Sequence, residues 1–182
     1  LGVLDGPDEE APEPRDLSKV RERTDANLRA MQVTSDAQRQ GRSLTQEEQQ
    51  EVLRYSGWGG LSIEKNLARM PADLKAAAVG LVHEYYTPSD LTRQVAQLLR
   101  PLLAGLNKVG TVRALEPSAG IGRFLQPFAD PGYEDVRFTA VEMSPVSAAM
   151  LRLTAPRTTV YEMPLEEFVT RHPEVDGQLD LL

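Results

Sequence analysis

The pattern of apolar and polar residues in the second half of the chain predicts parallel β-strands joined by helices. Strand-like apolar segments cover residues 111–116, 137–142 and 158–161, and a fourth strand is expected to start over 178–182. Helical spacing lies between them, over 122–128 and 144–153. Because strands that alternate with helices at this distance form βαβ units, we expect an α/β fold with a parallel sheet.

The first half of the chain carries helical signals. Residues 16–54 hold seven acidic and seven basic side chains, a balance typical of solvated helices and not of a phosphate-binding stripe. Thr45 and Glu48 have the spacing of a capping box, so a helix is expected to begin there and to end at residues 55–57. A further helix is expected over 72–82.

Two serines are expected to cap later helices. Ser89 precedes a helix with one apolar face, and Pro101 should kink or end that helix. Ser144 is followed by Pro145, and proline is favoured at the first helical position. We therefore divide the chain into three parts. These are an acidic, Pro-rich flexible linker (1–15), a helical N-terminal region (16–82) and an α/β half-domain (83–182).

Composition excludes several kinds of site. The 182 residues include no Cys and two His, so neither a disulfide framework nor a Cys-based or multi-histidine metal centre is expected. The net charge of −7 argues against a DNA-binding surface on this stretch alone. The longest apolar run, 76–82, is too short to span a bilayer, so we expect no membrane segment and a cytoplasmic protein.

The segment Gly57-Trp58-Gly59-Gly60 contains the only Trp of the chain. Three glycines in four positions predict a tight turn. We expect Trp58 to pack between helical layers, and the alternative is a backbone nest for a phosphate or a DNA strand. Two roles are likewise considered for Tyr85 and Tyr86, which could be packing residues or binding residues.

The segment Glu116-Pro-Ser-Ala-Gly-Ile-Gly122 lies between a predicted strand and the next helix. Its two glycines allow the backbone to pass close to a ligand. A dinucleotide fingerprint would need Gly or Ala at position 125, where this chain has Leu125. Glu116 suits a positively charged amino group, which S-adenosylmethionine carries beside its sulfonium. A helix-dipole partner is the alternative role for Glu116.

Further acidic residues follow the second and third predicted strands. Glu142 is placed to accept hydrogen bonds from both ribose hydroxyls, which NAD and S-adenosylmethionine share. It could instead flank the Ser144 cap. Met143 could lie on the adenine face, and Glu166 or Glu167 could meet the adenine amino group.

The segment Tyr86-Thr87-Pro88, followed by a helix and then by Glu116-Pro-Ser-Ala-Gly-Ile-Gly-Arg-Phe-Leu125, resembles the amino-methylating DNA methyltransferases. Residues 44–61 are similar to large phage- and plasmid-borne proteins that fuse such a methylase to a helicase, which implies a mobile-element or restriction-modification setting. The implied fold is a Rossmann-like S-adenosylmethionine-dependent methyltransferase sheet, incomplete with its first four strands, after a small helical region.

The resemblance implies roles for the residues and partners. Glu142 would hold the ribose and Glu166 or Glu167 the adenine, and the methionine end would be lined by Tyr86, Thr87, Pro88, Glu116, Pro117, Ala119, Gly120 and Gly122. The family methylates the exocyclic amino group of a flipped adenine. Its catalytic Asn/Asp-Pro-Pro-Phe/Tyr motif would lie just beyond Leu182, so we expect no catalytic residue here and no activity from this stretch alone.

DNA would then be bound through other regions of the polypeptide. The expected partner is the C-terminal remainder of the same polypeptide, and a helicase domain is one candidate for a part of that remainder. Two other functions stay open. One is a non-catalytic, methylase-like binding module in a phage or plasmid helicase protein, and the other is a methyltransferase acting on RNA or protein.

Overall fold

The computed structural model describes residues 17–106, 110–129, 133, 135–175 and 177–181. The predicted linker, 1–15, lies outside the described residues. Strands β1 (Val112–Glu116), β2 (Val136–Val141) and β3 (Thr159–Tyr161) form one parallel sheet in the order β1-β2-β3. The predicted α/β class with a parallel sheet is confirmed.

The fourth predicted strand is reduced to a single bridge. Leu181, the last residue that the structure describes, pairs in parallel with Ala114 of β1. The Leu115 N–H donates to the Leu181 carbonyl oxygen at 3.0 Å. Since β2 occupies the other edge of β1, this segment lies on the open edge, which gives the order 3-2-1-4 of a doubly wound sheet.

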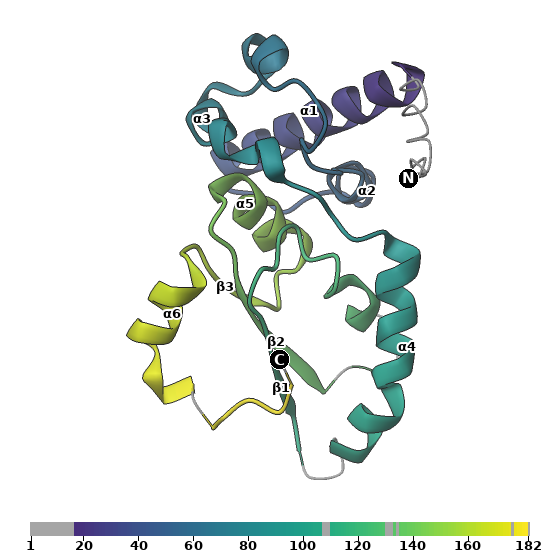
Figure 1. Ribbon diagram of the computed structural model, residues 1–182, viewed down its shortest axis with the longest axis vertical. Coiled ribbons are helices and arrows are strands. Elements are labelled where there is room, and N and C mark those ends of the chain that lie inside the picture. Colours follow the sequence, from purple (N-terminus) through teal and green to yellow (C-terminus); the bar gives the residue numbers. More distant parts are fainter. Residues whose placement is uncertain (1–16, 107–109, 130–132, 134, 176, 182) are drawn as a thin grey trace, which may run out of the picture.

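Three helices surround the sheet (Figure 1): α4 (Ser89–Leu106), α5 (Pro145–Thr154) and α6 (Leu165–Arg171). Helices α4 and α6 lie on opposite sides of the strands, and α5 lies between the strands and the N-terminal helices. The Ser144 cap is confirmed, because its hydroxyl accepts a hydrogen bond from the Ser147 N–H and Pro145 opens the helix.

Of the two outcomes expected at Pro101, a kink or the end of the helix, the second does not occur, because α4 continues to Leu106. Two other predictions in this half are wrong. Residues 122–125 form turns before a 3₁₀ helix (Gln126–Ala129), because Pro127 lacks the N–H that an α-helix would need there. Ser89 is the first residue of α4 and not the residue that precedes it, and its hydroxyl accepts a hydrogen bond from Arg123 at 2.6 Å.

The N-terminal region consists of helices α1 (Leu17–Gln40), α2 (Gln46–Leu53) and α3 (Ala72–Lys75), with 3₁₀ helices over Glu64–Arg69 and Ala76–His83. The helix predicted over 72–82 is thus α-helical only at its start, because Gly80 lowers the helical propensity of the second part. Helix α2 ends at Leu53 with Arg54 as C-cap, earlier than predicted.

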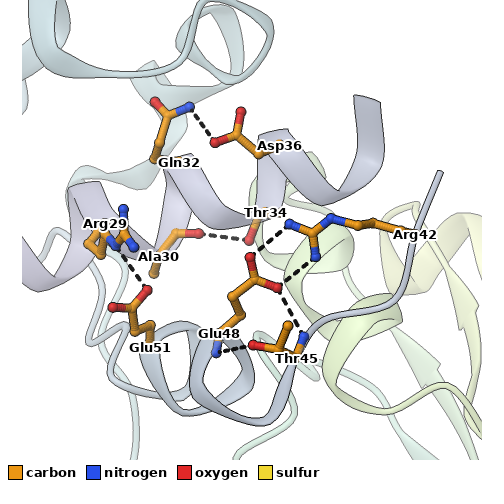
Figure 2. A network of polar contacts seen from close by, with 9 residues as sticks. All are labelled: Arg29, Ala30, Gln32, Thr34, Asp36, Arg42, Thr45, Glu48 and Glu51. Carbon is orange, nitrogen blue, oxygen red and sulfur yellow. Dashed lines mark hydrogen bonds and ion pairs between the residues drawn. The ribbon is translucent and has the colours of Figure 1, made fainter. Parts of the chain in front are cut away.

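Charged pairs tie helix α2 to α1 and to the connection between the two helices (Figure 2). The capping box is confirmed: the Glu48 N–H donates to the Thr45 hydroxyl at 3.2 Å, and the Thr45 N–H donates to the Glu48 carboxylate at 2.9 Å. Arg42 donates to both oxygens of that carboxylate, at 2.6 and 2.7 Å. Beside it, Arg29 of α1 pairs with Glu51 of α2 at 2.9 Å.

Helix α1 is not the solvated helix that its charge balance predicts. Its residues from Asn27 to Ala37 are mostly buried, and several of them are polar, including Asn27, Thr34 and Ser35. These polar residues find partners, as in the bond from the Thr34 hydroxyl to the Ala30 carbonyl at 2.8 Å. Because these buried residues are polar, the pattern of hydrophobic residues does not predict that this face of α1 is buried.

The largest cluster of buried side chains crosses between the two parts of the chain. It joins Met31 of α1 and Trp58 to Ile121, Val146 and Met150 of the α/β half. Trp58 is fully buried, as predicted. None of the described helices is long and apolar enough to cross a membrane.

Candidate functional site

The predicted site residues gather at the carboxyl ends of β1 and β2, where open α/β sheets bind ligands. Glu116 is the last residue of β1, and Glu142 directly follows β2. The Glu142 carboxylate accepts a hydrogen bond from the Gly120 N–H at 2.7 Å and another from the Ser144 N–H at 2.6 Å. Glu142 therefore both holds the Gly loop and flanks the Ser144 cap.

Both carboxyl groups are half-buried in a way that favours a cationic ligand. Burial raises the pKa of Glu116, and the Ser118 N–H offsets this only in part. Burial also raises the pKa of Glu142, against hydrogen bonds from Ser144 and Gly120 that lower it. A positive charge placed between these groups would offset the cost of burying them.

Tyr86 covers the Gly loop. A Cβ atom on Gly120, which has φ +53°, would lie 2.3 Å from the Tyr86 ring, so only glycine fits there. Gly122, with φ +82°, packs in the same way against Leu151 of α5. The two adjacent tyrosines differ in burial, since Tyr86 is half-buried and Tyr85 is 72% exposed.

Glu84 is a residue of this site that sequence reasoning missed. Its carboxylate accepts hydrogen bonds at 2.6 Å from the hydroxyls of Tyr55, Tyr86 and Ser147. Burial raises the pKa of Tyr55 well above its ordinary value, and the charge of Glu84 adds to this rise. The same causes raise the pKa of Tyr86. Both phenols therefore stay neutral and can donate to the carboxylate.

The Gly57–Gly60 segment packs against the backbone of Glu84 and against the side chains of Tyr85 and Tyr86. The Gly59 N–H donates to the Glu84 carbonyl oxygen at 2.9 Å, and a Cβ atom on Gly59 would lie 2.4 Å from the Tyr85 ring. From the other side, the Asn27 amide donates to the Gly57 carbonyl at 2.7 Å, and Arg23 contacts the same carbonyl at 3.3 Å. Gly57 and Gly59 serve close packing, whereas a Cβ atom on Gly60 (φ +75°) would have no atom within 4 Å. The Gly59 N–H is directed into the protein.

Arg123 is a second residue that the sequence did not single out. Its guanidinium donates to the Ser89 hydroxyl at 2.6 Å and to the Tyr55 carbonyl at 2.8 Å. It thus ties the Gly loop to the start of α4 and to the N-terminal region. An Arg directly after the second glycine was the only signal for it in the sequence.

The structure brings the remaining predicted residues less closely together. Thr87 and Pro88 lead directly into α4, next to Tyr86 in the chain. Met143 is 72% exposed. Glu166 is exposed in the first turn of α6, and Glu167 pairs with Arg171 of the same helix at 2.7 Å. The choice between Glu166 and Glu167 stays open.

A cavity of about 400 Å³ adjoins the Gly loop, since Ile121 and Gly122 are among its lining residues, and it extends away from the two carboxylates. Its lining includes Val136 and Phe138 at the beginning of β2 and Thr158 just before β3. These positions are at the amino ends of the strands, whereas Glu116 and Glu142 follow the carboxyl ends. Among the described residues, no group of His, Asp and Glu is arranged to hold a metal ion.

The fold and this site define an α/β protein with an acid-flanked Gly loop at the carboxyl edge of a parallel sheet. The chain is 29% identical over 153 residues to the Defense against restriction protein B of Escherichia phage P1, a match covering 84% of this chain and 6% of that protein. It is 32% identical over 103 residues to the Type II methyltransferase M.XamI of Xanthomonas campestris pv. amaranthicola, covering 56% of this chain and 18% of that protein.

The chain therefore spans a small part of both relatives. No family model matches it, and no solved structure does. Both similarities are distant, at 29% and 32% identity.

Proposed function

We propose that this chain is the cofactor-binding, N-terminal part of an S-adenosylmethionine-dependent DNA adenine-N6 methyltransferase. The observation that carries the proposal is the pair of half-buried carboxyl groups, Glu116 and Glu142, on either side of a glycine loop at the ends of adjacent parallel strands. A ligand with two positive charges and a ribose matches this donor and acceptor pattern.

In this proposal each residue has a role toward the cofactor. Glu116 would pair with the ammonium group of the methionine part. Each oxygen of the Glu142 carboxylate accepts one backbone hydrogen bond and keeps further acceptor capacity for a ribose hydroxyl. Met143 and Glu166 or Glu167 would meet the adenine, and the methionine part would be lined by Tyr86, Thr87, Pro88, Pro117, Ala119, Gly120 and Gly122.

When bound, S-adenosylmethionine supplies an activated methyl group on a sulfonium. In the proposed reaction the acceptor is the exocyclic amino group of an adenine taken out of the DNA stack. The residues of this chain bind and orient the cofactor. The group that accepts the amino proton is assigned to the Asn/Asp-Pro-Pro-Phe/Tyr motif expected after Leu182.

Calorimetric titration tests the cofactor site. We expect the protein to bind S-adenosylmethionine and not NAD, and the Glu142→Ala variant to lose about 1.5–3 kcal/mol of binding free energy, the contribution of hydrogen bonds to a charged group. The matched control is Glu162→Ala, which removes an exposed carboxylate paired with Arg152. NAD binding, or an affinity that Glu142→Ala leaves unchanged, would refute the site.

A second candidate is a methylase-like binding module within a large phage protein. The match to the phage P1 protein covers more of this chain than the match to the methyltransferase does, 84% against 56%. Reading the coding sequence past Leu182 separates the two functions. An Asn/Asp-Pro-Pro-Phe/Tyr motif there supports the methyltransferase, and its absence supports the binding module.

A further inference from the structure

The carboxylate of Glu84 connects three parts of the molecule that are distant in sequence. It accepts hydrogen bonds from Tyr55 after α2, from Tyr86 before α4, and from Ser147 in α5, all at 2.6 Å. The Tyr86 and Ser147 hydroxyls also lie 2.9 Å from each other. All three partners are hydroxyl groups, so one carboxylate is the common acceptor that orders them.

This network fixes the ring of Tyr86 over the Gly loop. A Cβ atom on Gly120 would lie only 2.3 Å from the ring. A movement of the ring therefore changes the space above Gly120. The Gly120 N–H in turn donates to Glu142 at 2.7 Å. The contacts therefore run from Glu84 through Tyr86 and Gly120 to Glu142.

The backbone of Glu84 is fixed as well. Its carbonyl oxygen accepts from the Gly59 N–H at 2.9 Å and would lie 2.4 Å from a Cβ atom on Gly57. The Gly57 carbonyl is held by the buried amide of Asn27 at 2.7 Å. The N-terminal helical region thus reaches the Gly loop through Glu84.

We propose that Glu84 is a positioning residue, which holds Tyr86 against Gly120 and so shapes the part of the site that receives the amino-acid end of S-adenosylmethionine. Glu84 itself does not contact the cofactor. This inference rests on the proposed function and adds a role for the Gly57–Gly60 segment, which is to support Glu84.

The test compares two ligands that differ only at that end. S-adenosylhomocysteine has the amino-acid part, and 5′-methylthioadenosine keeps the adenine, ribose and sulfur without it. In Glu84→Gln, an NH₂ group replaces one oxygen that accepts from hydroxyls. We expect the affinity for S-adenosylhomocysteine to fall at least about tenfold, while the affinity for methylthioadenosine stays within about twofold.

Two further variants complete the experiment. Tyr86→Phe keeps an aromatic ring at position 86 but removes the hydroxyl by which Glu84 holds it, so the ring is free to move from Gly120 and the same selective loss is expected. Glu51→Gln removes an exposed carboxylate of α2 and should change neither affinity. Circular dichroism checks that each variant is folded.

The outcomes separate the two proposals. A wild-type protein that binds neither ligand refutes the proposed function, and the role of Glu84 falls with it. The second case is a wild-type protein that binds both ligands, while folded Glu84→Gln and Tyr86→Phe lose affinity for both ligands equally or for neither. That result keeps the proposed function and refutes positioning by Glu84. Where Glu84→Gln does not fold, Tyr86→Phe alone decides between these results.

Discussion

At the scale of single residues, glycines and carboxylates determine the shape and charge of the site. The glycines differ in what surrounds them, although several share a positive φ. A Cβ atom on Gly120 (φ +53°) would meet the Tyr86 ring, whereas one on Gly41 (φ +59°) would have no atom within 4 Å. This pair separates the cost of backbone strain from the cost of a steric clash.

We expect Gly120→Ala to destabilise the fold more than Gly41→Ala. Gly41→Ala should cost about 1–2 kcal/mol, which is typical of a left-handed conformation at an L-residue. Gly120→Ala adds the displacement of Tyr86, about 1–3 kcal/mol more, as in overpacked cores. Urea unfolding of both variants measures the difference. Equal free energies of unfolding would show that Tyr86 does not press on Gly120.

The raised pKa of Glu116 predicts how cofactor affinity depends on pH. The carboxylate attracts a cation only when it is ionised, and burial moves its protonation above the ordinary value of 4.5. Affinity for S-adenosylmethionine should therefore fall as the pH is lowered from 7, starting above the range of an exposed Glu. The loss arises because, at lower pH, the carboxyl group of Glu116 in the free protein holds a proton that must be released when the cofactor binds.

Calorimetry between about pH 5 and 7 measures the profile. Glu116→Gln should bind more weakly at pH 7 and give a flatter profile, with any remaining slope due to Glu142, whose pKa burial also raises. An unchanged slope in Glu116→Gln would assign the pH dependence to other groups.

Sequence reasoning identified Glu142 and the Gly loop because strand ends and glycines leave local signals. It missed Glu84 and Arg123, whose partners include residues 29 and 68 positions away in the sequence. Such contacts depend on the tertiary arrangement, and no periodicity or spacing records them.

At the scale of elements, the loop after α2 is held by polar side chains of α1. Asn27, which is fully buried, donates to the Gly57 carbonyl at 2.7 Å and accepts from the Ser56 N–H at 2.9 Å. Strands were predictable because apolar residues make up most of each short segment. The buried face of α1 was not, since Asn27, Thr34 and Ser35 interrupt it with polar residues.

We expect Asn27→Ala to lower the free energy of unfolding by about 1–3 kcal/mol, because the Ser56 N–H loses the acceptor that Asn27 provides and the Gly57 carbonyl keeps only the longer contact with Arg23. The matched control is Asn66→Ala, since the Asn66 amide donates to the Ser62 carbonyl at 2.8 Å in an exposed setting. Thermal unfolding compares the two variants. A similar effect from both would mean that the Asn27 contacts contribute no more than a surface hydrogen bond.

At the scale of the whole molecule, one cluster of buried side chains joins the helical N-terminal region to the α/β half. The predicted division at residues 82 and 83 follows the change in sequence pattern, whereas the packing of Trp58 with Met150 depends on the folded chain. The division into domains stays a prediction.

We expect both parts to unfold together. Met150→Ala in α5 should cost about 2–5 kcal/mol, the range for a buried Met. The unfolding midpoint should then shift by the same amount whether it is followed by circular dichroism or by the fluorescence of Trp58, the only Trp of the chain. Leu98→Ala, at a position 80% exposed in α4, is the control. Separate midpoints for the two signals would show two independent units.

The close packing of Gly59 against Tyr85 also restricts how the sequence can vary. A side chain at position 59 would occupy the space of the Tyr85 ring, at 2.4–2.6 Å from its atoms. Among related sequences, a larger residue at 59 should therefore occur together with a smaller one at 85. The two positions should change as a pair during divergence, although they are far apart in the sequence and only one of them is exposed.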